Sequence, residues 1–181
     1  MSSKHALLGF GAAAVLSVCR IIAAESAPAA DTPGFIAGAF RNPPVPAKLA
    51  LAGPLAVRVS QILGHKYAQP EITYWREADV TAWILQSKAK SGRITAGFVI
   101  KDGKVATCEV LAYTESRGRE IRSPRFLKQL TGTSLRDGQL DREVDGITGA
   151  TLSVNALRNL TRLALTLDGT ARDKDTASGT L

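Results

Sequence analysis

The sequence contains few of the residues that bind metals or attach haem. Its 181 residues include two cysteines and two histidines, and neither a C-x-x-C-H nor an H-E-x-x-H pattern occurs. Both patterns place ligands at the spacing that haem or metal chemistry needs. We therefore predict no metal site and no c-type haem. Once the amino-terminal segment is removed, Cys108 is the only cysteine left, so we also expect no internal disulfide.

Aromatic residues and runs of positive charge are scarce as well. Aromatics make up 6% of the chain, and no four basic residues stand in a row, although 23 Lys and Arg outnumber 16 Asp and Glu. Proteins that bind single-stranded nucleic acid combine a basic groove with aromatic stacking platforms. The net charge of +7 is therefore better explained by a solvated basic surface, and we expect no nucleic-acid partner.

The first 24 residues differ in character from the rest. Lys4 precedes the apolar stretch ALLGFGAAAVLSV (6–18), whose length is typical of a signal peptide and short for a membrane span. Small residues up to Ala24 suit cleavage there, while Cys19 loosely resembles a lipidated cysteine. A buried amino-terminal helix is the competing interpretation. We predict that residues 1–24 are a signal peptide or membrane anchor and that the protein is extracytoplasmic, in the periplasm.

A linker and then a mixed domain follow. Residues 25–53 are rich in alanine, proline and glycine and predict a linker. Local patterns next predict a helix over 54–64 and strands over 72–75 and 80–87.

The clearest strand signal is RITAGFVIKDGKVATCEVLAY (93–113). Two apolar runs flank Asp102-Gly103, as in a β-hairpin. Cys108 lies in the second run and is expected to be a small core residue.

Helical signals dominate the carboxy-terminal part. Ser123-Pro124 predict a capped helix that ends near Gly132. A stripe of apolar residues predicts a last helix from Ser153 to Asp168-Gly169, after which residues 169–181 are expected to form a flexible tail. Together these elements predict a single α+β domain over 54–168, with an antiparallel sheet, a β-hairpin and two or three packed helices.

The decapeptide VDGITGATLS (144–153) precedes this last helix. One interpretation is plain capping of the helix by the hydroxyl of Thr151 or Ser153. The other is an anion site, because a helix start favours a phosphate, while Gly149 and Ala150 keep side-chain bulk away from the backbone. No Walker A or G-x-G-x-x-G pattern accompanies the decapeptide, so a known nucleotide loop is not supported.

Residues 145–153, DGITGATLS, resemble the flavinylation motif D-x-x-[ST]-G-A-T-x-[ST] of FMN-binding domains. These domains occur in the sodium-pumping NADH:quinone reductase, in the Rnf complex and in stand-alone exported FMN-binding proteins, which are closest in length. In that family a magnesium-dependent flavin transferase uses FAD to attach FMN to the last threonine by a phosphoester bond. The resemblance implies covalent FMN on Thr151. It also implies that the cofactor site includes Asp145, Thr148, Gly149, Ala150 and Ser153.

A second segment, YTESRGREI (113–121), is similar to the family's glutamate–hydroxyl–x–glycine segment, which lies against the flavin. With it the resemblance covers about residues 72–167. It implies cofactor contacts from Glu115, Ser116 and Gly118, and it departs from the domains of the two membrane complexes at Arg117, where proline is usual. Three arginines could place positive charge near the reduced flavin or form a solvated basic face. They are Arg117, Arg119 and Arg122.

The resemblance implies an exported flavoprotein that relays electrons between the membrane and extracytoplasmic redox partners. FMN would be its cofactor and the transferase its maturation partner, with Asp145 a candidate recognition residue for that enzyme. No catalytic residue is implied, because the flavin supplies the chemistry. One alternative is a flavin-dependent reductase of a small acceptor such as a quinone or metal chelate. Another is a flavin-free binding module whose motif only starts a helix.

Overall fold

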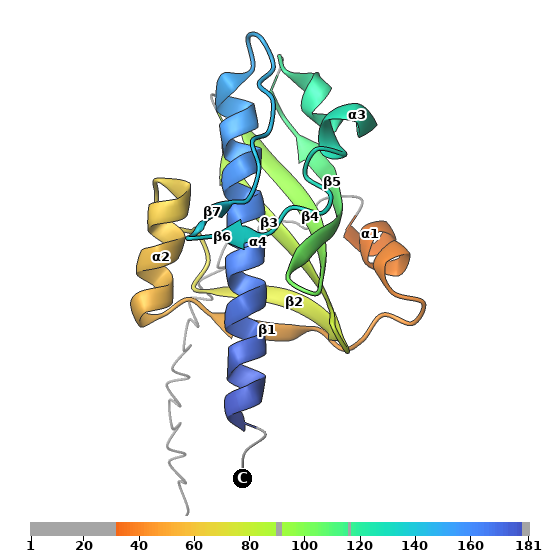
Figure 1. Ribbon diagram of the computed structural model, residues 1–181, viewed down its shortest axis with the longest axis vertical. Helices are drawn as coiled ribbons and strands as arrows, with labels where there is room; N and C mark the ends of the chain where they lie inside the picture. The colour runs from red at the N-terminus through yellow and green to blue at the C-terminus, as the bar shows by residue number, and fades with distance from the viewer. Residues whose placement is uncertain (1–31, 90–91, 116, 179–181) are drawn as a thin grey trace, which may run out of the picture.

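The computed structural model describes residues 32–89, 92–115 and 117–178 (Figure 1). The predictions for residues 1–24, for Cys19 and for Ser116 lie outside this part of the chain. One antiparallel sheet has the order β1-β2-β3-β4-β5, so each strand pairs with its sequence neighbour. Its strands are β1 (Ala47–Ala50), β2 (Glu71–Glu77), β3 (Val80–Lys88), β4 (Arg93–Lys101) and β5 (Lys104–Tyr113). This sheet, with its packed helices, confirms the predicted α+β class.

Strands β4 and β5 form the predicted hairpin. Asp102 and Gly103 have φ values of 51° and 70°, the left-handed pair that a two-residue type I′ turn requires. The register shifts twice along this pair, leaving Ala106 and Leu111 as extra residues on β5. Such bulges break the alternation of sides. This is why Val105 and Tyr113, at odd positions, lie on the same face of the sheet as Cys108, which is buried in the main core as predicted.

The helices and a small second hairpin complete the fold. The helical elements are α1 (Thr32–Ala39), α2 (Gly53–Leu63), η1 (Arg119–Arg122), α3 (Pro124–Leu127) and α4 (Thr151–Ser178), and β6 (Leu135–Arg136) pairs with β7 (Gln139–Leu140). The predicted cap of α3 is confirmed, because Ser123 Oγ accepts a hydrogen bond from the Phe126 N–H at 3.3 Å. Within the described residues, no helix has the length and apolarity that crossing a bilayer requires.

The main core lies between the sheet and α4. Figure 1 shows α4 lying across one face of the sheet, with α2 beside it. Trp83 and Phe98 of the sheet and Leu157 of α4 are fully buried in one cluster. Burying such side chains stabilises the fold by roughly 2–3 kcal/mol each. The sheet and α4 therefore share one continuous core, which determines where α4 starts.

The opposite face of the sheet is covered by α1, which lies in the stretch predicted to be a linker. Phe35 and Ile36 of α1 are buried there against Val99 and Leu111. Gly97 makes this contact possible, since a Cβ atom at that position would lie 2.6 Å from the Phe35 ring. The linker prediction was based on the alanine, proline and glycine content of residues 25–53. It missed α1 because it did not consider the two large apolar side chains that anchor this helix.

Helix α4 continues beyond Asp168-Gly169, where the sequence predicted its end. The Asp168 carboxylate is buried, and it accepts hydrogen bonds from Thr81 Oγ1 at 2.6 Å and from Arg172 Nε at 2.8 Å. A buried, paired carboxylate is part of the core and does not mark a helix end. The prediction of a flexible tail from residue 169 is therefore wrong for residues 169–178, which are helical.

Candidate functional site

The two segments singled out in the sequence meet where β5 ends and α4 begins, at the top of the molecule in Figure 1. The Tyr113 hydroxyl lies 2.8 Å from Ser153 Oγ, and it also donates a hydrogen bond to the Arg117 carbonyl. A phenol has one proton to donate, so Ser153 is the donor to Tyr113. A single side chain thus connects the 113–118 segment to the first turn of α4.

Gly118 and Ala150 form a second close approach between these segments. A Cβ atom on Gly118 would lie 2.6 Å from the Ala150 Cβ and 2.9 Å from the Tyr113 hydroxyl oxygen. Gly118 also has a φ of 79°, a left-handed conformation that strains any other residue. Only glycine meets both conditions, so the approach of the two segments depends on it.

The decapeptide makes a tight turn immediately before α4. The Ala150 N–H donates to the Ile147 carbonyl at 3.0 Å, and Gly149 has a φ of 79°, as the third residue of a type II turn requires. The Ala150 carbonyl then accepts from the Val154 N–H at 3.0 Å. This is the first bond of the helix, which makes Ala150 the capping position. The interpretation of Thr151 or Ser153 as the cap is therefore wrong.

The hydroxyls of the decapeptide point in different directions. Thr148 and Thr151 are exposed, whereas Ser153 is buried against Tyr113. Thr151 is the first residue of α4, and the N–H groups of a helix's first turn have no carbonyl partner within the helix. An exposed hydroxyl therefore stands beside free N–H donors and the positive end of the helix dipole, an arrangement that favours an attached phosphate.

The neighbours of Thr151 open the site to another molecule. Neither Gly146 nor Gly149 has an atom within 4 Å of where its Cβ would be, so the loop is thin and free of packing there. Asp145 is exposed, and its N–H donates to Gln129 Oε1 at 2.8 Å, which ties the start of the motif to the segment after α3.

Glu115 occupies a different environment from the other predicted site residues. It is 8% exposed, and its Oε1 accepts a hydrogen bond from the Gly92 N–H at 2.6 Å. This contact holds the start of β4 against the segment that follows β5. Arg117 and Arg119 lie exposed on either side of Gly118.

Sequence reasoning missed two residues of this region. Tyr113, the last residue of β5, makes the connecting hydrogen bonds, and Leu152 is 55% exposed directly after Thr151. The signal for Tyr113 was its place at the head of YTESRG, where an aromatic side chain ends the apolar alternation of a strand. Leu152 gave no signal, because a leucine in a helical stretch is normally expected to face the core.

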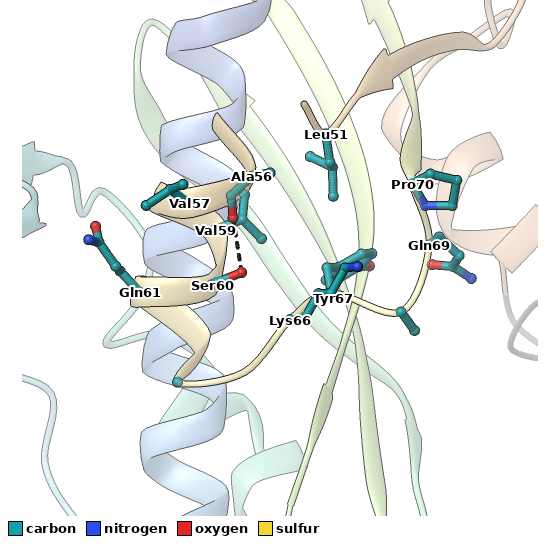
Figure 2. Close-up of a pocket in the computed structure, with 12 residues that line it drawn as sticks. Leu51, Ala56, Val57, Val59, Ser60, Gln61, Lys66, Tyr67, Gln69 and Pro70 are labelled. Atoms are coloured by element: carbon teal, nitrogen blue, oxygen red, sulfur yellow. Dashed lines mark hydrogen bonds between the residues drawn. The ribbon is translucent and has the colours of Figure 1, made fainter. Parts of the chain in front are cut away.

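A separate cavity of about 730 Å³ lies between α2 and residues 64–70. Figure 2 shows Val57 and Ser60 on one side of it and Pro70 on the other. None of the predicted site residues lines it. The arrangement around Thr151 is instead an exposed loop with inward-facing supports, suited to holding a tethered group.

The family model of the FMN-binding domain matches residues 90–166. The matched stretch contains β4, β5, both predicted segments and the first half of α4, and it lies within the 72–167 stretch expected from the motifs. No curated protein and no solved structure matches the chain.

Proposed function

We propose that the protein holds FMN covalently on Thr151 and relays electrons outside the cytoplasm. The match of residues 90–166 to the FMN-binding domain supports FMN as the cofactor of a flavoprotein. The observation that carries this proposal is the exposed Thr151 hydroxyl at the first position of α4. Ala150 before it and Ser153 after it are buried. Thr151 is thereby presented outward from a fixed base.

The environment of Thr151 suits its modification by a second enzyme. Its Oγ attacks the FMN-side phosphorus of FAD, a phosphoester bond forms, and the bond from that phosphorus to AMP breaks. The hydroxyl proton passes to a base of the transferase, which also supplies the magnesium ion. The open space at Gly146 and Gly149 lets the loop enter that enzyme's active site. The phosphoester anion that results is stabilised by the start of α4.

Neighbouring side chains would hold the ring of the attached cofactor. Leu152 offers an exposed apolar surface beside Thr151, and a flat aromatic ring placed on it would remove both surfaces from water. The opposing segment contributes Arg117, Gly118 and Arg119. The positive charges of the two arginines favour the reduced, anionic form of the flavin. When bound, FMN exchanges one or two electrons, while the protein sets the potential at which it does so.

Export is the second part of the proposal and comes from the apolar stretch 6–18. A covalent bond is useful in that compartment, because a tethered cofactor keeps a high effective concentration without a surrounding FMN pool. Redox partners would then include membrane or extracytoplasmic proteins, and the exposed arginines suit partners with an acidic surface.

Co-expression with an active flavin transferase tests the proposal. We expect in-gel flavin fluorescence after denaturation, and mass spectrometry of peptides should place one FMN phosphoester on Thr151. Thr151→Ala should abolish the fluorescence, while Thr131→Ala, which removes an exposed hydroxyl outside the motif, should retain it. Full flavin retention in Thr151→Ala contradicts the proposal. Steady-state reduction of a quinone by the purified holo-protein would instead favour the reductase alternative.

A further inference from the structure

The cavity beside α2 has two well-defined walls. Figure 2 shows Val59 and Ser60 of α2 on the side of the segment that contains Tyr67 and Pro70. Its volume of about 730 Å³ lies within the range of pockets that hold small molecules. The cavity is large enough for a ligand, and no residue of the FMN site contributes to it.

The second wall is held in place by the sheet. Helix α2 ends where Gly64 adopts a φ of 73° and its N–H donates to the Ser60 carbonyl at 2.9 Å, which turns the chain away from the helix. The buried Tyr67 then anchors the returning segment, since its hydroxyl accepts a hydrogen bond from the Gln86 N–H of β3 at 3.3 Å. The walls are thus kept apart by fixed contacts.

The cavity presents mainly hydrocarbon to its interior. Ser60 Oγ donates to the Ala56 carbonyl at 2.9 Å, the dashed line in Figure 2, so this polar group is already satisfied. Val57 is 58% exposed at the rim. The apolar lining residues are Leu51, Ala56, Val57, Val59, Ala68 and Pro70. A ligand chain that covers such a surface is stabilised, because apolar area of both the ligand and the cavity is removed from water.

The charge at the cavity has one sign. Lys66 is the single charged residue among those that line it, and it is exposed. The next acidic residue along the chain, Glu71, forms an ion pair with Lys48. An anionic group at the mouth would therefore meet one cation and no lining carboxylate, whereas a cationic group would be repelled.

We propose that this cavity binds a long-chain carboxylate, with its hydrocarbon chain between α2 and residues 66–70 and its head group beside Lys66. The lining residues all fall within 51–70 and precede the matched domain at 90–166. The site therefore belongs to the part of the chain outside that match, and it acts independently of the flavin.

Calorimetric titration of the purified full chain tests this site with probes that share a dodecyl chain, used below micelle formation. We expect saturable binding of dodecanoate, and binding up to about fivefold weaker for dodecanol and weaker still for dodecyltrimethylammonium, because an exposed ion pair contributes at most about 1 kcal/mol. Lys66→Met should lower the affinity for dodecanoate to that for dodecanol. Lys128→Met, which removes an exposed lysine outside the cavity, should leave it unchanged.

A pair of tryptophan variants distinguishes binding in the cavity from nonspecific adsorption of the dodecyl chain to the protein surface. Ala68→Trp fills the cavity from an exposed lining position and should abolish dodecanoate binding. Ala37→Trp adds the same side chain at an exposed position of α1 and should retain it. Circular dichroism of both variants checks that they are folded. Undiminished binding by Ala68→Trp, or equal affinities for dodecanoate and dodecanol, would overturn the proposal.

Discussion

The hydroxyl groups of Tyr113 and Ser153 lie 2.8 Å apart, and this contact joins the last residue of β5 to the first turn of α4. Ser153 is 5% exposed, so its hydroxyl depends on this partner. The contact fixes the direction in which the preceding exposed residues, Thr151 and Leu152, project. A buried hydrogen bond therefore supports a loop that is otherwise open to solvent.

Tyr113→Phe should destabilise the fold and loosen this loop. The change removes the donor to the Arg117 carbonyl and leaves the buried Ser153 hydroxyl without its acceptor, for a cost of about 1–2 kcal/mol. Urea unfolding measures the cost. The double variant with Ser153→Ala should show a coupling energy of roughly 1 kcal/mol, and strictly additive effects would mean that the two hydroxyls do not interact.

Gly118→Ala should harm both stability and flavin attachment. The new methyl group would lie 2.6 Å from the Ala150 Cβ and sit on backbone with a φ of 79°. Strain of about 1–2 kcal/mol from the left-handed backbone adds to about 1–3 kcal/mol from overpacking. Urea unfolding and in-gel flavin fluorescence measure the two effects.

The control for this change is Gly103→Ala. Gly103 has a φ of 70°, but no atom lies within 4 Å of its Cβ position, so it should show the backbone strain alone and keep full flavin attachment. Equal losses in the two variants would show that the contact between Gly118 and Ala150 contributes nothing to the site.

The fold was predictable where local rules decide it. The Asp102-Gly103 turn and the Ser123 cap depend on a few neighbouring residues, and their sequence signals were correct. The bulge at Leu111 and the cover of Gly97 by Phe35 depend on residues far apart in the chain. Local sequence patterns do not predict such long-range contacts, so the bulge and the contact between Phe35 and Gly97 were not predicted.

The candidate site was predictable only through its motifs. They placed Thr151 on a loop before the last helix and the 113–121 segment near it, and the structure brings the two together. Periodicity misplaced the helix start by two residues, because Ser153 faces Tyr113 and does not cap. Thr151 is exposed and Ser153 is buried because α4 packs against the end of β5. The sequence of the loop alone does not predict this packing.

Arg172→Ala tests why α4 continues beyond Gly169. The change leaves the buried Asp168 carboxylate, whose Oδ2 accepts from Arg172 Nε at 2.8 Å, with Thr81 as a neutral partner. We expect a loss of about 2–4 kcal/mol in the free energy of unfolding, because an uncompensated buried charge is costly. Adding Asp168→Asn should recover part of this loss. Arg136→Ala, at an exposed position, should change stability little.

The buried thiol of Cys108 should make stability fall in alkaline solution. Burial, with a smaller contribution from Glu109, raises the pKa of this thiol above its ordinary value of 9.0. The folded chain therefore keeps the proton while the unfolded chain releases it, so the stabilising contribution is complete below about pH 9 and declines as the pH rises above it. Between pH 8 and pH 10 the loss should be about 1.4 kcal/mol.

A Cys108→Ala chain isolates this effect from other groups that titrate in the same range. The variant has no thiol at that position, so its unfolding free energy, measured in urea at both pH values, should fall by about 1.4 kcal/mol less than that of the parent. Tyr67, whose pKa is also raised by burial, titrates in both chains and cancels in the comparison. Identical pH dependence in the two chains would mean that the thiol is equally accessible to solvent in the folded and unfolded states, contrary to its burial in the main core.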